Sequence, residues 1–323
     1  MKYRTLGKSG IKISAVGYGC MGLSHGYGAV PEHEEAIRLI RKAKELGCTF
    51  FDTAEVYGAG HNELLTGEAI EPFRNDVVLA TKFFCTTAEG DLESAIRRHL
   101  DASLRRLRTD HIDLYYQHRI EEDDQIEKVA EVMGKLISEG LIGGWGQSQS
   151  TADQIRRAHS VTPLTAVQCE YSMMERSFER EVIPACEELG IGFVAFSPLA
   201  SGFLSGKYSS KTTYPGDDVR RVITRFAQEN VIANQPLLDL LYRYAESKGV
   251  TAAQLSLAWM LKKKDFIVPI PGMRRDERIA ENLGAADVEL TDIEFAAIEQ
   301  ELAKVEIHGN RTDADIAKLK TLN

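Results

Sequence analysis

The sequence predicts an α/β protein that folds as a single (β/α)₈ barrel, the TIM barrel, and three observations lead to this prediction. Short apolar runs of strand length alternate along the chain with longer segments in which apolar residues recur every three or four positions. The strand-length runs number eight, and runs such as 77–80 are apolar at successive positions, as expected of parallel strands covered on both faces. Such a barrel needs about 250 residues, and the chain has 323. We therefore expect one domain over residues 1–323, with additions to the basic barrel.

The first expected addition is a β-hairpin at the start of the chain. Residues 3–6 and 11–14 flank Gly7-Lys8-Ser9-Gly10, a sequence that is typical of a tight turn. The eight barrel strands should then follow in chain order. They are expected at residues 15–19, 49–52, 77–82, 112–118, 142–146, 166–170, 192–197 and 266–269.

Amphipathic helices are expected between these strands. Two of them show a clear stripe of apolar residues at helical spacing, so each can cover one face of the sheet. The stripes consist of Leu92, Ile96, Leu100 and Leu104, and of Ile126, Val129, Met133, Leu136 and Ile137.

Two further segments are too long to be simple connections. The loop after strand seven, residues 201–234, is rich in Ser, Gly, Thr and charged residues, which indicates a lid or a binding loop. The segment from His308 onward has no partner strand, and we expect it to help cover the mouth of the barrel.

The composition excludes several classes of function. Lys and Arg number 39 against 48 Asp and Glu, and the formal charge of −9 argues against nucleic acid and anionic membranes as partners. No window reaches the roughly 18 apolar residues of a membrane span, and the start of the chain lacks a signal-peptide core. The five cysteines have no CxxC spacing, so neither a disulfide framework nor a zinc site is expected. A cytoplasmic protein follows, and its oligomeric state is not indicated.

Polar residues end three neighbouring strands of the predicted barrel. Asp52 ends the second strand and Tyr57 follows it, Lys82 ends the third, and His118 ends the fourth. Reactive residues in this architecture lie at the carboxyl ends of the strands. Each residue alone has an ordinary structural explanation, such as a solvated lysine or a helix-capping aspartate. Four of them at the same end of adjacent strands favour a shared site.

These four groups are suited to proton donation. A phenol is a weak acid at neutral pH, and an ammonium group beside it stabilises the phenolate, so Lys82 can lower the pKa of Tyr57. A buried lysine needs a counter-charge to stay protonated, which Asp52 can supply. His118 can bond the oxygen of a substrate or help to relay the proton.

Three segments that contain these residues resemble motifs of a known family. Residues 51–58 (FDTAEVYG), 80–82 (ATK) and 115–119 (YYQHR) are similar to the Asp, Tyr, Lys and His tetrad motifs of the aldo-keto reductases. The resemblance covers nearly the whole chain, extending to residues 168–172, 195–202 and 270–282. It is closest to the bacterial and plant branch that includes pyridoxal reductases and aryl-alcohol dehydrogenases.

This resemblance implies an NADPH-dependent reductase that converts aldehydes or ketones to alcohols. It implies that Tyr57 donates the proton, that Lys82 and Asp52 tune it, and that His118 orients the carbonyl oxygen. The implied coenzyme contacts are Gly19, Cys20 and Met21 at the nicotinamide ribose, Ser148, Gln149 and Gln168 at the carboxamide, Phe196 as a stacking platform for the nicotinamide ring, Ser197, Leu199, Ser201 and Gly202 along the pyrophosphate, Arg274 and Arg278 at the 2′-phosphate, and Glu281 and Asn282 at the adenine. Gly272 and Met273 stand where many members have a lysine and a hydroxyl residue, which bears on the strength of the NADPH preference.

The sequence disfavours several other interpretations. The run 17–22 (GYGCMG) fits GxGxxG, but two more glycines and no helical period follow it, which disfavours a Rossmann domain. Histidine motifs for metals and a GxSxG elbow are missing from the sequence. Two alternatives remain open, namely a coenzyme-sensing regulatory subunit with little turnover and a physiological direction of alcohol oxidation.

The substrate is not specified by these motifs, because loops set specificity in this architecture. The expected pocket walls are residues 24–30, 83–84, 171–174, Arg119 and the segment after Ser201. Phe84, Met173 and Met174 suggest an apolar mouth, with core packing as the alternative, and Arg119 suggests contact with an anionic substituent.

Overall fold

A computed structural model of the chain describes residues 1–321. Its centre is a sheet of eight parallel strands in sequential order. The strands are β3 (Tyr18–Gly19), β4 (Phe50–Asp52), β5 (Val78–Phe83), β6 (Leu114–Gln117), β7 (Trp145–Ser148), β8 (Ala166–Glu170), β9 (Gly192–Phe196) and β10 (Ile267–Pro269).

The first and last strands meet, so the sheet closes on itself. Gly17 N donates to Pro269 O at 2.9 Å, and Gly19 N donates to Pro271 O at 3.1 Å. A parallel bridge between Gly19 and Gly272 continues this contact, and we call the line along which β3 meets the end of β10 the seam. The predicted (β/α)₈ barrel is thereby confirmed.

The strand β7 begins later than expected, at Trp145 instead of residue 142. Gly143 and Gly144 precede it, and glycine weakens a strand because it has no side chain to pack. A Cβ atom at Gly144 would come within 2.3 Å of Thr165 Oγ1, so this stretch also passes too close to its neighbour for a larger residue. The shift moves Ser148 from beyond the expected strand to its last position.

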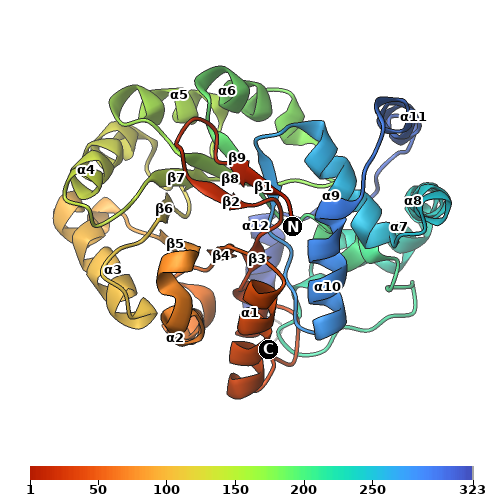
Figure 1. Cartoon of the computed structure of the whole chain (residues 1–323), viewed down its shortest axis with the longest axis horizontal. Coiled ribbons are helices and arrows are strands. Elements are labelled where there is room, and N and C mark those ends of the chain that lie inside the picture. Colours follow the sequence, from red (N-terminus) through yellow and green to blue (C-terminus); the bar gives the residue numbers. More distant parts are fainter. Residues whose placement is uncertain (322–323) are drawn as a thin grey trace.

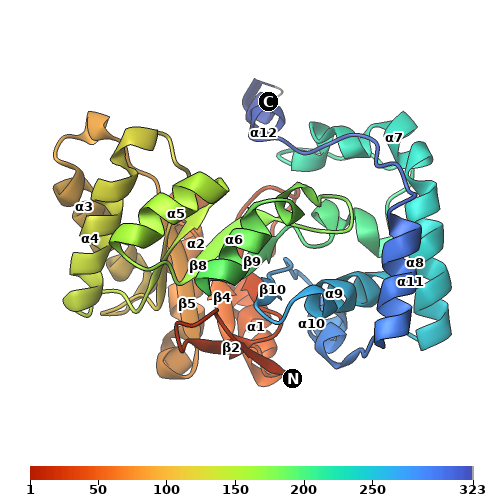
Figure 2. The same ribbon diagram turned by 90° about the horizontal axis from the view of Figure 1, so that it is seen from above.

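The predicted hairpin closes the amino-terminal end of the barrel. Strands β1 (Tyr3–Thr5) and β2 (Lys12–Ser14) pair antiparallel. Leu6 and Ile13, beside and within this hairpin, are fully buried in a cluster with interior residues of the barrel such as Leu114. Figure 2 shows the hairpin and the C-terminal segment at opposite ends of the molecule. The other end of the barrel is therefore free for a site.

Helices cover the outside of the barrel (Figure 1). In the helix over residues 92–107, for example, Ile96 and Leu100 of the expected apolar stripe are buried. Thr151, Thr251 and Thr291 each cap the start of a helix with reciprocal bonds to the third helical residue. The helices are α1 (His33–Glu45), α2 (His61–Ile70), α3 (Leu92–Leu107), α4 (Ile126–Ser138), α5 (Ala152–Val161), α6 (Val182–Leu189), α7 (Gln228–Ala233), α8 (Gln235–Lys248), α9 (Ala252–Lys263), α10 (Asp276–Gly284), α11 (Asp292–Leu302) and α12 (Asp313–Ala317).

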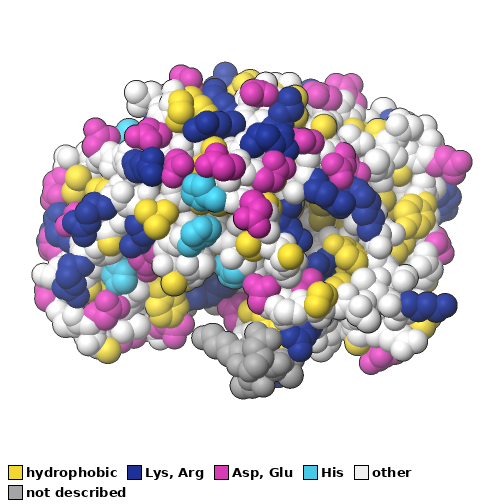
Figure 3. Space-filling model, turned by 90° about the horizontal axis from the view of Figure 1, so that it is seen from below, with side chains coloured by type: hydrophobic (Ala, Val, Ile, Leu, Met, Phe, Trp, Pro, Cys, Tyr) yellow, Lys and Arg dark blue, Asp and Glu magenta, His cyan; other side chains and the backbone are white. Residues whose placement is uncertain are grey.

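Charged residues of both signs are numerous in the sequence, and they are distributed over the surface. On the face drawn in Figure 3, acidic and basic side chains are interspersed, so this face presents no broad area of one sign. Within residues 1–321, none of the helices has the length and apolar character needed to cross a membrane.

Candidate active site

The four expected catalytic residues come together at the carboxyl end of the barrel. Asp52 is the last residue of β4, Lys82 lies near the end of β5, and His118 directly follows β6. Tyr57 opens a short 3₁₀ turn after β4, and its backbone N–H bonds to Ala54 O at 3.1 Å. The parallel order of the strands places these residues at one edge of the sheet.

Lys82 is the centre of this group. Its side chain is fully buried, and Nζ donates to Asp52 Oδ1 at 2.5 Å and to Thr53 O at 2.6 Å. Nζ also lies 3.4 Å from Tyr57 Oη. Burial works against the charge of Lys82, but Asp52 and Tyr57 together outweigh it and raise the pKa of the ammonium group. Lys82 therefore keeps its proton beside the phenol.

Asp52 is held from its other side by Gln168. The Asp52 Oδ2 atom accepts a hydrogen bond from Gln168 Nε2 at 2.8 Å, so both carboxylate oxygens have a partner. Burial raises the pKa of Asp52 above its usual value, although Lys82 and Gln168 partly offset that rise. The sequence indicated Gln168 as a coenzyme contact and missed this bond, because nothing in local spacing connects β8 to β4. The one available signal for a contact inside the barrel was a polar residue in the middle of a buried strand.

His118 faces the tyrosine edge-on. The two ring centroids are 5.8 Å apart at an interplanar angle of 84°, and the backbone N–H of His118 bonds to Phe83 O at 2.8 Å. Burial lowers the pKa of His118 well below its usual value, and the positive charges of Lys82 and Arg119 lower it further. The imidazole is therefore neutral at pH 7, with one ring nitrogen able to donate a hydrogen bond.

A cavity of about 470 Å³ opens in front of this group. Asp52, Tyr57 and His118 form part of its wall, together with the aromatic ring of Phe196 and the aliphatic side chain of Ile270. A second cavity of about 530 Å³ adjoins it, because Gly22, Tyr27, Ser197 and Gly272 line both. We call these two adjoining cavities the groove, and three of the four expected catalytic residues line one of them.

Most of the expected coenzyme residues line this groove. Ser197 and Ser201 have positive φ angles of 48° and 56°, and Gly202 follows at 94°, so this turn takes a tight left-handed path along the wall. Cys20, Gln149 and Glu281 do not line either cavity. The expected residues on the wall are Gly19, Met21, Ser148, Gln168, Phe196, Ser197, Leu199, Ser201, Gly202, Gly272, Arg274, Arg278 and Asn282.

The three expected residues that lie off the wall have partners elsewhere. The thiol of Cys20 is fully buried, and burial raises its pKa to about 12. The side-chain oxygen of Gln149 accepts a bond from Glu170 N at 3.4 Å, and Glu281 forms an ion pair with Arg278.

The far end of the groove carries polar atoms that lack a partner. Asn282 Oδ1 and Arg278 Nε are buried and make no hydrogen bond within the described part of the chain. Arg274 donates to the backbone oxygens of Ala29 and Tyr27 at 2.8 and 3.0 Å. Unmatched buried polar groups are costly, and these two atoms are available to a polar ligand.

Two loops that are distant in the sequence are bonded to each other where they line the groove. The carboxylate of Asp217 accepts bonds from Gly26 N at 2.8 Å and from Gly28 N at 3.1 Å. Val219 N adds a bond to Gly26 O at 3.0 Å. Arg220 packs over the rings of Tyr27, Tyr208 and Tyr214 at 4.3 to 5.3 Å. The long loop after β9 thus lines the groove and is hydrogen-bonded to the loop of residues 26–28, a partner that the sequence did not reveal.

The C-terminal segment covers the mouth of the cavity beside Tyr57 and His118, as expected. Ile316 and Leu319 line it, together with Arg311. The expected wall residues Met173 and Met174 are instead buried in the hydrophobic core, so core packing was the correct alternative for them. Phe84 lines a shallow recess beside His118 and Arg119.

Comparisons with known proteins identify relatives of the whole chain. The model of the Aldo/keto reductase family matches residues 15–303. A Glycine max protein named probable aldo-keto reductase 1 is 38% identical over 314 residues, covering 95% of this chain and 90% of that protein. A glycerol dehydrogenase from Gluconobacter oxydans has a similar structure, with a TM-score of 0.84, 26% identity, and coverage of 96% of this chain and 97% of that one. An aldo/keto reductase from Klebsiella pneumoniae in complex with NADP and acetate has a TM-score of 0.75, 26% identity, and coverage of 97% and 99%.

Proposed function

This chain belongs to the aldo/keto reductase family, a family of oxidoreductases, and on that premise we propose that it is an NADPH-dependent reductase of aldehydes or ketones with Tyr57 as the general acid. The observation that carries the proposal is the position of Lys82. Its buried ammonium group contacts Asp52 on one side and the hydroxyl of Tyr57 on the other, and Tyr57 faces the cavity.

The groove fits a dinucleotide coenzyme. Phe196 offers a flat apolar surface near the catalytic group, and the tight turn from Ser197 to Gly202 lets backbone come close to a pyrophosphate. Arg274 and Arg278, the latter paired with Glu281, supply positive charge in the cavity that Asn282 also lines. These residues would hold NADPH, which when bound supplies the hydride for carbonyl reduction.

The residues of the chain move the proton. Tyr57 Oη gives its proton to the carbonyl oxygen as the alcohol forms, and the nearby ammonium of Lys82 stabilises the phenolate that remains. Asp52, fixed by Gln168, keeps Lys82 charged. Neutral His118 can donate a hydrogen bond that orients the carbonyl oxygen. Solvent returns a proton to Tyr57 after release of the product.

The test is the oxidation of NADPH and of NADH with a panel of aromatic and aliphatic aldehydes, for the wild type and for Tyr57→Phe. We expect Tyr57→Phe to lower kcat by about 10²- to 10⁴-fold, the usual contribution of general acid catalysis, while coenzyme binding measured by fluorescence is retained. Tyr3→Phe, at a half-exposed tyrosine of the hairpin, is the matched control. Unchanged turnover in Tyr57→Phe would refute the role of Tyr57. Tight NADPH binding without carbonyl turnover in the wild type would favour the coenzyme-sensing alternative.

A further inference from the structure

Two arginines stand at the mouth of the catalytic cavity and take no part in the proposed proton transfer. Arg119 directly follows His118, and Arg311 comes from the C-terminal segment; both line the cavity that Tyr57 faces. The guanidinium carbon of Arg311 lies 5.1 Å from the ring centroid of Phe196. Both arginines are thus beside the space in which a substrate must bind.

The carboxylate of Asp313 is bound between these arginines. Arg119 Nε donates to Asp313 Oδ2 at 2.7 Å, and Arg119 Nη2 lies 3.3 Å from Oδ1, so the contact is two-pronged. Arg311 Nη1 lies 3.9 Å from Oδ1 of the same carboxylate. Partial burial opposes its charge, but the hydrogen bond from Arg119 and the charge of Arg311 hold the pKa of Asp313 below its usual value. This is the geometry with which a protein binds a carboxylate ligand.

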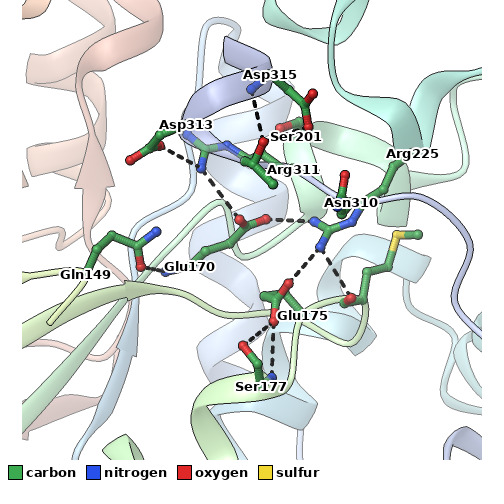
Figure 4. A network of polar contacts seen from close by, with 12 residues as sticks. Gln149, Glu170, Glu175, Ser177, Ser201, Arg225, Asn310, Arg311, Asp313 and Asp315 are labelled. Carbon is green, nitrogen blue, oxygen red and sulfur yellow. Dashed lines mark hydrogen bonds and ion pairs between the residues drawn. The ribbon is translucent and has the colours of Figure 1, made fainter. Parts of the chain in front are cut away.

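The C-terminal segment is anchored just before this contact. Asn234 exchanges two hydrogen bonds of 2.9 Å with the backbone of His308, and Asn310 N donates to Thr224 Oγ1 at 2.8 Å. Figure 4 shows Arg311 in an ion pair with the buried Glu170, which accepts a hydrogen bond from Arg225 at 2.7 Å. Arg311 is therefore fixed from the barrel side, whereas Asp313 lies beyond the last of these anchors.

Asp313 differs from the other carboxylates at this end of the barrel. Glu170 and Asp52 are buried, at 4% and 3% side-chain exposure, and are tied to cations from the barrel or its loops. Asp217 is occupied by the backbone of Gly26 and Gly28. The side chain of Asp313 is 54% exposed. Ion pairs that are open to water contribute little to stability, so its carboxylate can be exchanged at small cost.

We propose that Arg119 and Arg311 form an anion subsite that binds the carboxylate of the substrate in exchange for Asp313, so that the preferred substrates are aldehydes or ketones that carry a carboxylate. This inference rests on the proposed function. The Asp313 side chain then acts as an internal substitute that fills the subsite between turnovers.

The test compares short ω-oxo acids of increasing chain length with their methyl esters, which have nearly the same shape and no charge. The series is needed because it samples different separations of aldehyde and carboxylate. Steady-state kinetics with NADPH are measured for the wild type, Arg119→Met and Asp313→Asn. Arg156→Met serves as a control, because Arg156 is a half-exposed arginine of α5 paired to Glu188.

We expect the wild type to prefer at least one oxo acid over its ester. Arg119→Met should raise KM for that acid by roughly 10- to 100-fold, the effect of losing a hydrogen bond to a charged group, and should change KM for the ester far less. Asp313→Asn should act in the opposite direction and lower KM for the acid, because its competitor for Arg119 is gone. Arg156→Met should leave the ratio of acid to ester unchanged.

Two results would overturn the inference while the proposed function stands. One is reduction of acids and esters with equal kcat/KM by the wild type. The other is an equal loss for acid and ester in Arg119→Met with no change in Asp313→Asn, since Arg119 would then act through His118. Failure of the wild type to reduce any aldehyde would instead refute the proposed function, and the inference with it.

Discussion

Replacing Asp52 by asparagine tests whether the buried ion pair holds the site together. The change keeps the shape of the side chain and removes its charge, which leaves the ammonium of Lys82 in a position with no exposure to water. Breaking a buried pair by removing one partner costs about 3 to 5 kcal/mol. Lys82 retains Thr53 O at 2.6 Å and Tyr57 Oη at 3.4 Å as acceptors, so we expect a loss near the lower end, about 3 kcal/mol.

The assay is urea unfolding at pH 7, with Asp292→Asn as the control. The side chain of Asp292 is 94% exposed although it pairs with Lys262, and such a surface change alters the free energy of unfolding by about 0.5 kcal/mol or less. A loss in Asp52→Asn no larger than in the control would refute the reasoning that Lys82 depends on this carboxylate.

The same variant makes a prediction about pH. Burial lowers the pKa of Lys82 and Asp52 opposes it, so removal of the carboxylate must lower the pKa of the ammonium group. A neutral lysine does not stabilise the phenolate of Tyr57. The activity that remains in Asp52→Asn should therefore decline, as pH rises, at a lower pH than the activity of the wild type. Coincident pH profiles of kcat would contradict this coupling.

Two more predictions concern stability and the thiols. Hydrogen bonding to Glu55 and Glu89 outweighs partial burial and raises the pKa of His99 to about 9. The contacts of His99 with these two carboxylates should therefore stabilise the fold fully below the pKa of an unfolded histidine, about 6.5, and lose this effect as pH rises through 9. After allowance for screening by solvent, we expect about 1 to 2 kcal/mol, measured as the difference in unfolding free energy between pH 6 and pH 10 for the wild type against His99→Gln; equal pH dependence in both proteins would disprove it. Four of the five cysteines are buried and the fifth, Cys85, is half-buried with its pKa raised by burial to about 11, so a thiol reagent at pH 8 should find at most one slowly reacting thiol in the native protein and five after denaturation. Two or more fast thiols in the native protein would contradict the burial.

Much of the barrel was predictable because its signals are local. Strand β8 was expected at residues 166–170 and is found there, buried along its whole length. Asp52, Lys82 and His118 were found by one rule, that polar residues at strand ends meet at one edge of a parallel sheet. To apply that rule, one needs only the order of the strands along the chain and not the contacts that each side chain makes.

The features that sequence reasoning missed are contacts between distant segments. The sequence around Gln168 does not indicate that its amide donates a hydrogen bond to Asp52. The sequence around Asp217 likewise does not indicate that its carboxylate accepts hydrogen bonds from the backbone N–H groups of Gly26 and Gly28. Met173 and Met174 were ambiguous because an apolar residue after a strand can face either a pocket or the core. These outcomes depend on how the closed barrel positions its loops, which local patterns do not specify.

The seam between β3 and the end of β10 has a consequence for synthesis of the chain. Until residues 267–272 have left the ribosome, the growing sheet has β3 as a free edge, with the backbone N–H groups of Gly17 and Gly19 unpaired. Open strand edges readily pair with other chains. A chain truncated before β10 should therefore aggregate, and a nascent chain should depend on chaperones until its last strand arrives. The four residues of the proposed proton transfer are all made early, but they become part of a closed barrel only when the final strand is in place.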